Sequence, residues 1–147
     1  MKQSIKEIEI SSKWYKGDIY IGSLSGLLTM NGEALINYLK ENINDTGVIY
    51  KCVNCIVRET LIIKSLNVLE EYQGKGYGKK ILIDTMNKYK PESIILIADI
   101  GKRQRAGFDL VTFYKKNEFK EISECMFYPL MFWPIEKADK ILMEINK

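Results

Sequence analysis

The chain has 147 residues, 46% of them hydrophobic, which predicts a single domain over residues 1–147 with a core of its own. Its 22 basic and 19 acidic residues leave a net charge of +3, too balanced to indicate nucleic-acid binding by itself. Histidine is absent, which excludes Ser-His and Cys-His nucleophile pairs and histidine metal sites. The charged start lacks a signal-peptide core, and no apolar run approaches the ~20 residues of a membrane span. We therefore expect a cytoplasmic protein without a membrane partner.

The spacing of apolar residues predicts strands and helices that mix along the chain. Alternation predicts strands over 5–10 and 19–24, and an amphipathic helix follows over 31–42. Apolar runs predict strands over 48–53 and 56–69, the second long enough for two strands or one bent strand. The remaining elements are a helix over 76–89, a fully buried strand over 93–99, a helix over 108–116, strands over 120–123 and 126–132, and a helix that begins at Pro134. This order predicts an α/β fold with a mixed, central β-sheet flanked by helices.

Two of the three cysteines, Cys52 and Cys55, form a CxxC pair inside the strand-like stretch YKCVNCIV. A redox CxxC pair lies at a strand-to-helix junction, and Asn54 suggests a turn here instead. A zinc site would need two more ligands, and only Cys125 remains as a sulfur. We interpret the pair as small apolar residues at a hairpin, and we expect no metal site.

The most informative segment is QGKGYG, Gln73 to Gly78, which lies between an aliphatic run and a predicted helix. Glycines at such a junction leave backbone N–H groups free at the positive end of the helix dipole, where phosphate binds. A Walker A loop is excluded because Gly78-Lys79 is followed by Lys80 rather than Ser or Thr. A dinucleotide fingerprint is excluded because the three glycines alternate and so have the wrong period. The segment predicts a phosphate-bearing ligand of another class.

Gln73, Gly76 and Gly78 fit the pattern Q/R-x-x-G-x-G/A, which resembles the acetyl-CoA signature of the GNAT N-acetyltransferase superfamily. The preceding Leu66-Asn67-Val68 lies where the family has a splayed strand, and GKGYGKKILID is similar to its first CoA-binding helix. The resemblance implies acetyl-CoA as co-substrate, held by strand main chain, by loop N–H groups and by lysine charge, with the Val68 N–H donating to the oxyanion. The implied cofactor-binding residues are Leu66, Asn67, Val68, Gln73, Gly74, Lys75, Gly76, Tyr77, Gly78 and Lys79.

A second segment, DLVTFYKKNEFK, resembles the part of the family that places a tyrosine beside the CoA sulfur. Helical spacing alone puts Tyr114 on an inward face with Leu110 and Val111, which also suits an ordinary core tyrosine. A phenol has a pKa of about 10, so at neutral pH it is protonated and can give its proton to a departing thiolate. The resemblance implies that Tyr114 is the catalytic residue that does so.

The sequence departs from the family pattern in three places. Leu69 follows Val68 where proline is frequent. Gly107 stands where an asparagine often contacts the CoA arm, which puts that contact in doubt. Glu118-Phe119 replaces the usual Gly-Phe, which suggests a different turn into the next strand.

The resemblance implies direct transfer of an acetyl group to a primary amine on a small-molecule or peptide acceptor. Glu59, Glu70 and Asp99 are candidate bases, and none of them is assigned. Two alternatives stay open, the first being a toxin-like enzyme that acts on aminoacyl-tRNA and the second a non-catalytic acyl-CoA-binding module. The basic run Lys102-Arg103-Gln104-Arg105, with Lys115, Lys116 and Lys120, would serve the first by binding a phosphate backbone. The aromatic stretch FYPLMFW predicts either a core strand or a homodimer surface.

Overall fold

A six-stranded β-sheet is the centre of the computed structural model, which describes residues 7–30, 32–55, 59–98, 109–123 and 129–146. In sheet order the strands are β1 (Glu7–Lys16), β2 (Ile19–Thr29), β3 (Thr60–Val68), β4 (Ser93–Ile97), β6 (Leu130–Trp133) and β5 (Lys120–Ser123). The helices are α1 (Gly32–Asn42), α2 (Thr46–Asn54), α3 (Tyr77–Tyr89), α4 (Leu110–Lys116) and α5 (Ile135–Ile145), with a short 3₁₀ helix, η1 (Glu70–Tyr72). Neighbouring strands are antiparallel, except that β3 and β4 are parallel.

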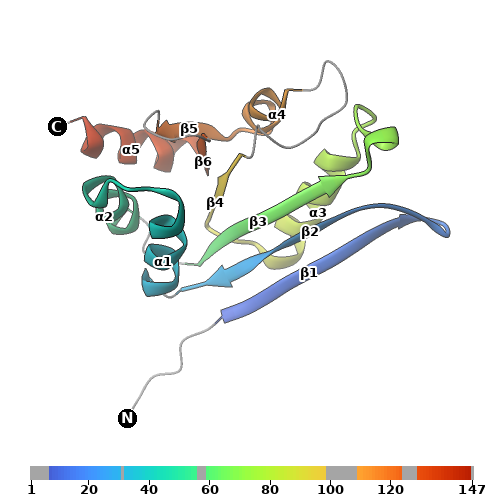
Figure 1. Ribbon diagram of the computed structural model, residues 1–147, viewed down its shortest axis with the longest axis horizontal. Helices are drawn as coiled ribbons and strands as arrows, with labels where there is room; N and C mark the ends of the chain where they lie inside the picture. Colours follow the sequence, from blue (N-terminus) through green and yellow to red (C-terminus); the bar gives the residue numbers. More distant parts are fainter. Residues whose placement is uncertain (1–6, 31, 56–58, 99–108, 124–128, 147) are drawn as a thin grey trace, which may run out of the picture.

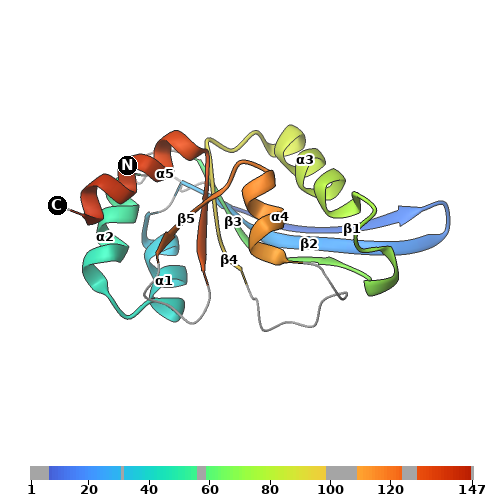
Figure 2. The same cartoon turned by 90° about the horizontal axis from the view of Figure 1, so that it is seen from above.

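Helices cover both faces of this sheet (Figures 1 and 2). The helices α3 and α4 pack on one face, and α1, α2 and α5 pack on the other. Successive residues of β4 are buried against the two layers in turn, Ile94 and Leu96 against the first and Ile95 against the second. The predicted α/β fold, a mixed central sheet flanked by helices, is therefore confirmed. Within the described part of the chain, no helix is both long and apolar enough to cross a membrane.

The strand predicted over 48–53 is wrong, because this segment is the helix α2. Asp45 caps the helix: its carboxylate accepts hydrogen bonds from the N–H groups of Gly47 (2.9 Å) and Val48 (3.2 Å). The apolar residues Val48, Ile49 and Cys52 then form one buried helical stripe. The CxxC pair accordingly lies on a helix and not at a hairpin. Burial raises the pKa of Cys52 to about 12, so its thiol stays protonated and packs as a small apolar group.

The other predicted elements occur with shifted ends. β1 and β2 continue well past Ile10 and Leu24, and β3 is one strand that begins at Thr60. In β6, Leu130 and Phe132 are buried, so this part of FYPLMFW is core strand. Residues 5, 6, 31, 56–58, 99, 108 and 126–128, which the predictions also included, lie outside the described residues.

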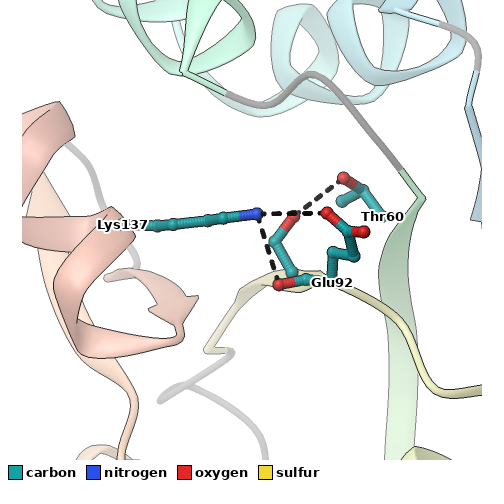
Figure 3. Close-up of polar contacts among 4 residues, drawn as sticks. Thr60, Glu92 and Lys137 are labelled. Carbon is teal, nitrogen blue, oxygen red and sulfur yellow. Dashed lines mark hydrogen bonds and ion pairs between the residues drawn. The ribbon is translucent and has the colours of Figure 1, made fainter.

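The parallel strands β3 and β4 pair only at one end. Their register runs from Thr60 opposite Ser93 to Ile63 opposite Leu96, and β3 then continues with β2 alone. At the paired end the buried hydroxyls of Thr60 and Ser93 share a hydrogen bond of 2.9 Å. Next to it, the Lys137 ammonium of α5 donates to the Glu92 carbonyl (3.5 Å) and lies 3.8 Å from its carboxylate, as Figure 3 shows. Figure 1 shows the two strands diverging from this end.

The divergence begins at a β-bulge in β3. Gly26 of β2 lies opposite Ile63, and Ser25 lies opposite Ser65, so Lys64 is an extra residue without a partner. A bulge bends its strand and changes which side chains face each way. Ile63 before the bulge and Leu66 after it therefore both pack toward α3 and α4. The bulge turns β3 away from β4 where their pairing stops.

We expect the Thr60–Ser93 hydrogen bond to be measurable by a double-mutant cycle. Thr60→Val keeps the side-chain shape but leaves the Ser93 hydroxyl buried without this partner, which should lower the free energy of unfolding by about 1–3 kcal/mol. Adding Ser93→Ala removes the orphaned hydroxyl and should recover part of that loss. Urea denaturation of the four proteins checks this, and additive effects of the two substitutions would contradict it.

Candidate functional site

The divergence of β3 and β4 opens a cavity of about 780 Å³, which lies within the range of small-molecule sites. The second half of β3 and the end of β4 form its sides. The glycine loop closes one end, and α4 contributes Leu110, Phe113 and Tyr114. Segments far apart in the sequence therefore meet around one space.

Most of the residues predicted to bind a cofactor line this cavity. They are Leu66, Asn67, Val68, Gln73, Gly74, Gly76, Gly78 and Lys79. Lys75 and Tyr77 are not among the lining residues. The Lys75 ammonium lies 5.9 Å from the centre of the Tyr72 ring, and the Tyr77 ring packs edge-to-face on the same ring at 6.1 Å. Both side chains therefore pack against Tyr72 and not into the cavity.

The main chain of β3 presents unpaired groups to the cavity. The Leu69 N–H donates to the Ile21 carbonyl of β2 (2.9 Å), and main-chain groups of alternate residues in a strand point to opposite sides. The N–H groups of Leu66 and Val68 therefore point away from β2, toward the gap left by β4. No described residue accepts from either of them. The bond at Leu69 also gives a reason for the missing proline, because proline has no N–H to donate.

The glycine loop presents a second set of unpaired N–H groups. Lys80 makes the first bond of α3, to the Gly76 carbonyl (3.1 Å), and the N–H groups from Gly74 to Lys79 have no acceptor among the described residues. Gly74 and Gly76 have φ angles of 79° and 85°, which other residues rarely adopt. A Cβ on Gly76 would have no neighbour within 4 Å. The loop is therefore open to a ligand at the positive end of the α3 dipole.

Gly78 matters for packing and not for conformation, because a side chain here would press on a neighbouring ring. A Cβ at this position would lie 3.1 Å from the Phe113 ring, so its absence lets α4 approach the first turn of α3. The Gln73 side chain has a related role, since its amide donates to the Val68 carbonyl (2.9 Å) and ties the loop to the end of β3. Both residues fix the loop relative to the unpaired strand.

Tyr114 is almost fully buried, at 4% exposure, and it lines the cavity. Its ring packs edge-to-face against Phe113 (5.1 Å) and Phe119 (5.3 Å), and its hydroxyl has no hydrogen-bond partner among the described residues. Burial holds the pKa of Tyr114 well above its ordinary value, with a smaller contribution from the nearby Tyr38. The phenol is therefore neutral and keeps a proton that it can donate.

A helix C-cap fixes the position of Tyr114. The Phe119 N–H donates to the Tyr114 carbonyl (3.0 Å) and the Glu118 N–H donates to the Lys115 carbonyl (3.1 Å), the two bonds of a Schellman motif. Glu118 has a φ of 71°, the left-handed conformation that glycine adopts most easily. The expectation of a different turn at Glu118-Phe119 is therefore wrong, because glutamate adopts the conformation that favours glycine.

The candidate bases and basic residues are dispersed. Glu70 lines the cavity, whereas Glu59 precedes β3 at the paired end of the strands. Lys116 also lines the cavity, and Lys120 forms an ion pair with Asp139 of α5. Asp99, Gly107 and the run 102–105 lie outside the described residues. Among the residues that are described, no group of three or more cysteines and acids is placed to hold a metal.

Sequence reasoning missed three features of the site. Phe113 packs over Gly78, and the Asn67 side-chain oxygen is buried without a hydrogen-bond partner among the described residues. The third is Tyr38 of α1, whose hydroxyl accepts a hydrogen bond from the Ile97 N–H (3.1 Å). Burial raises the pKa of Tyr38 to about 12, although this hydrogen bond lowers it. The amphipathic pattern over 31–42 gives no sign of this contact with β4.

Comparison of the sequence with protein-family models and with curated proteins finds no match. Comparison with solved structures does find similar folds. Naa50 of Arabidopsis thaliana, in complex with the bisubstrate analogue CoA-Ac-MVNAL, superimposes with a TM-score of 0.51 at 20% identity over 80% of this chain and 68% of that chain. PH1933 of Pyrococcus horikoshii OT3 gives a TM-score of 0.48 at 21% identity over 80% and 60%. The likeness to Naa50 shows that this chain has a GNAT-like fold.

The left-handed conformation of Glu118 predicts that Glu118→Gly stabilises the protein. Glycine adopts this φ without the Cβ clash, and its greater freedom in the unfolded chain offsets part of the gain. We expect the free energy of unfolding to rise by about 0.5–1 kcal/mol. Thermal and urea denaturation check the value, and an unchanged or lower stability would show that Glu118 makes a compensating contact.

Proposed function

We propose that this protein is an acetyl-CoA-dependent N-acetyltransferase that acetylates a primary amine. The observation that carries the proposal is the meeting of three features in one cavity: the unpaired main chain of β3, the free N–H groups of the glycine loop, and the Tyr114 hydroxyl. The likeness to Naa50, whose structure contains a CoA-based bisubstrate analogue, supports it at the level of the fold.

From one end of the cavity to the other, its residues suit the successive chemical groups of acetyl-CoA: diphosphate, pantetheine arm and thioester. The loop from Gly74 to Lys79 offers N–H groups and the Lys79 ammonium to the diphosphate. The main chain of β3 offers the N–H groups of Leu66 and Val68 and the Leu66 carbonyl to the pantetheine amides, as a neighbouring strand would, while the Val68 carbonyl accepts from Gln73. The cavity then continues to Tyr114, at the place where the thioester would lie.

The proposed reaction is direct attack by the acceptor amine on the thioester carbonyl carbon. A new C–N bond forms, the C–S bond breaks, and the amine nitrogen loses a proton to solvent. The Val68 N–H would donate to the carbonyl oxygen as negative charge develops there. Tyr114 would give its proton to the departing thiolate sulfur, and solvent would later restore it.

The acceptor is left as a class, a neutral primary amine on a small molecule or peptide. Incubating the protein with acetyl-CoA and a panel of antibiotics, polyamines, amino acids and peptides, and measuring free-thiol release, tests the activity directly. Acetyl-CoA binding without thiol release on any amine would favour the non-catalytic binding module.

We predict that Gly76→Glu abolishes acetyl-CoA binding. The new side chain occupies open space in the loop, and its carboxylate repels the diphosphate. Gly17→Glu is the matched control, because Gly17 also has a positive φ (60°) and no neighbour within 4 Å of a Cβ, but lies in the β1–β2 turn. Calorimetry should show tight binding for the control and none for Gly76→Glu. Equal binding by both variants would refute the assignment of the loop.

We predict that Tyr114→Phe keeps acetyl-CoA binding and loses about a hundredfold or more in turnover, the usual contribution of a general acid. Tyr89→Phe is the control, since Tyr89 packs against the same hydrophobic cluster but does not line the cavity. Steady-state thiol release measures both variants. Unchanged turnover in Tyr114→Phe would remove this residue from the mechanism.

The raised pKa of Tyr114 also fixes the sign of the pH dependence. Its proton stays bound below the raised value, so turnover should rise with pH as the acceptor amine deprotonates. We expect no descending limb from Tyr114 below about pH 10. A decrease in wild-type turnover as pH rises toward about 10, absent in Tyr114→Phe, would contradict this assignment.

A further inference from the structure

The hydroxyl of Tyr38 occupies the place of a main-chain acceptor in the sheet. The Ser93 N–H of β4 donates to the Glu59 carbonyl (3.4 Å), on the β3 side, and the Ala98 N–H donates to the Pro129 carbonyl (2.8 Å), on the β6 side. Because N–H groups alternate along a strand, the Ile97 N–H points to the β3 side. It donates to Tyr38 (3.1 Å) and not to a carbonyl of β3.

The position of Ile97 is where β4 loses β3 as a neighbour. The last paired residues are Ile63 and Leu96, so Ile97 is the first residue beyond the register, and it lines the cavity. A buried N–H without an acceptor is costly, and a carbonyl of β3 would be its natural partner. With Tyr38 as acceptor, the Ile97 N–H is satisfied while the strands stay apart.

We propose that Tyr38 is a positioning residue that holds β3 and β4 apart, and so keeps the main chain of Leu66 and Val68 available to the pantetheine arm. This inference rests on the proposed function, because the arm is that of acetyl-CoA. Tyr38 comes from the α1 face of the sheet and Tyr114 from the α4 face.

The test compares acetyl-CoA with a ligand that lacks the pantetheine arm. In Tyr38→Phe the ring remains but the hydroxyl acceptor is lost. The Ile97 N–H can then pair with a carbonyl of β3, and the ligand must break this pairing to enter the gap between β3 and β4. We expect acetyl-CoA to bind about tenfold more weakly, the effect of losing one hydrogen bond to a buried group. Adenosine 3′-phosphate 5′-diphosphate, which has the diphosphate but no pantetheine arm, should bind with unchanged affinity. Calorimetry with the two ligands measures both values.

A second measurement reads the hydrogen bond itself. The Ile97 amide should exchange with deuterated water faster in ligand-free Tyr38→Phe than in the wild-type protein, if it loses its acceptor. Tyr50→Phe is the control, because Tyr50 is an exposed tyrosine of the neighbouring α2, and it should change none of these values. Slower exchange at Ile97 in Tyr38→Phe would contradict the proposal, because the Tyr38 hydroxyl would then not be what protects this amide.

Three other results would overturn it. One is unchanged acetyl-CoA affinity in Tyr38→Phe. Another is an equal loss of affinity for both ligands, which would indicate a general loss of structure. The third is unchanged exchange at Ile97. If the wild-type protein binds neither ligand, the proposed function fails, and the role of Tyr38 in ligand binding fails with it. The Ile97 exchange rate still decides then whether Tyr38 caps β4.

Discussion

The incomplete pairing of β3 and β4 is the constraint on which the rest of the structure depends. Parallel neighbouring strands normally form main-chain hydrogen bonds along their whole shared length. In contrast, β3 and β4 pair at one end and separate at the other. At the joined end, the hydroxyls of Thr60 and Ser93 link the two strands, and Lys137 of α5 contacts Glu92 just before β4. At the other end, the Lys64 bulge turns β3 away. A paired end next to a divergent end therefore opens a cavity between the two strands.

This arrangement leaves main-chain groups unpaired inside the protein, which costs free energy unless a ligand or water bonds them. Three hydrogen bonds reduce that cost. The Tyr38 hydroxyl accepts from the Ile97 N–H, the Gln73 amide donates to the Val68 carbonyl, and the Leu69 N–H donates to β2. Among the described residues, the groups left without a partner include the N–H groups of Leu66 and Val68 on the strand and those of the glycine loop. A selective set of donors in one cavity is the mark of a binding site.

The sequence predicted the fold and the loop well, because both rest on local patterns. Alternation and apolar runs identify β4 and the strand that enters the loop, and Gly76 marks the start of α3 by its conformation. It failed at α2, where the apolar run VIYKCV suits a strand equally well, and only the cap by Asp45 decides for a helix. Glycine at position 78 also has a reason that no local pattern contains, its contact with Phe113.

Tyr38 shows the physical limit of such prediction. Its role depends on the register of two parallel strands and on the exact residue at which they separate, and neither quantity is encoded within the helix that carries Tyr38. The spacing of apolar residues assigns a side chain to one face of its helix. It does not predict which main-chain group of the sheet that side chain will contact. The same limit applies to Glu118. A glycine before Phe119 would predict a left-handed turn, but the turn forms with glutamate as well.

The protonation states in the cavity restrict the chemistry that it can perform. Tyr114, which lines the cavity, has a raised pKa, so its phenol keeps its proton and does not serve as a base at neutral pH. Among the described residues that line the cavity, Glu70 is the one carboxylate, and it is exposed at the rim. The described lining of the cavity therefore offers hydrogen-bond donors and a neutral phenol, and no buried carboxylate. It therefore suits a reaction whose leaving group needs a proton and whose nucleophile arrives already neutral, and amine attack on a thioester has both properties.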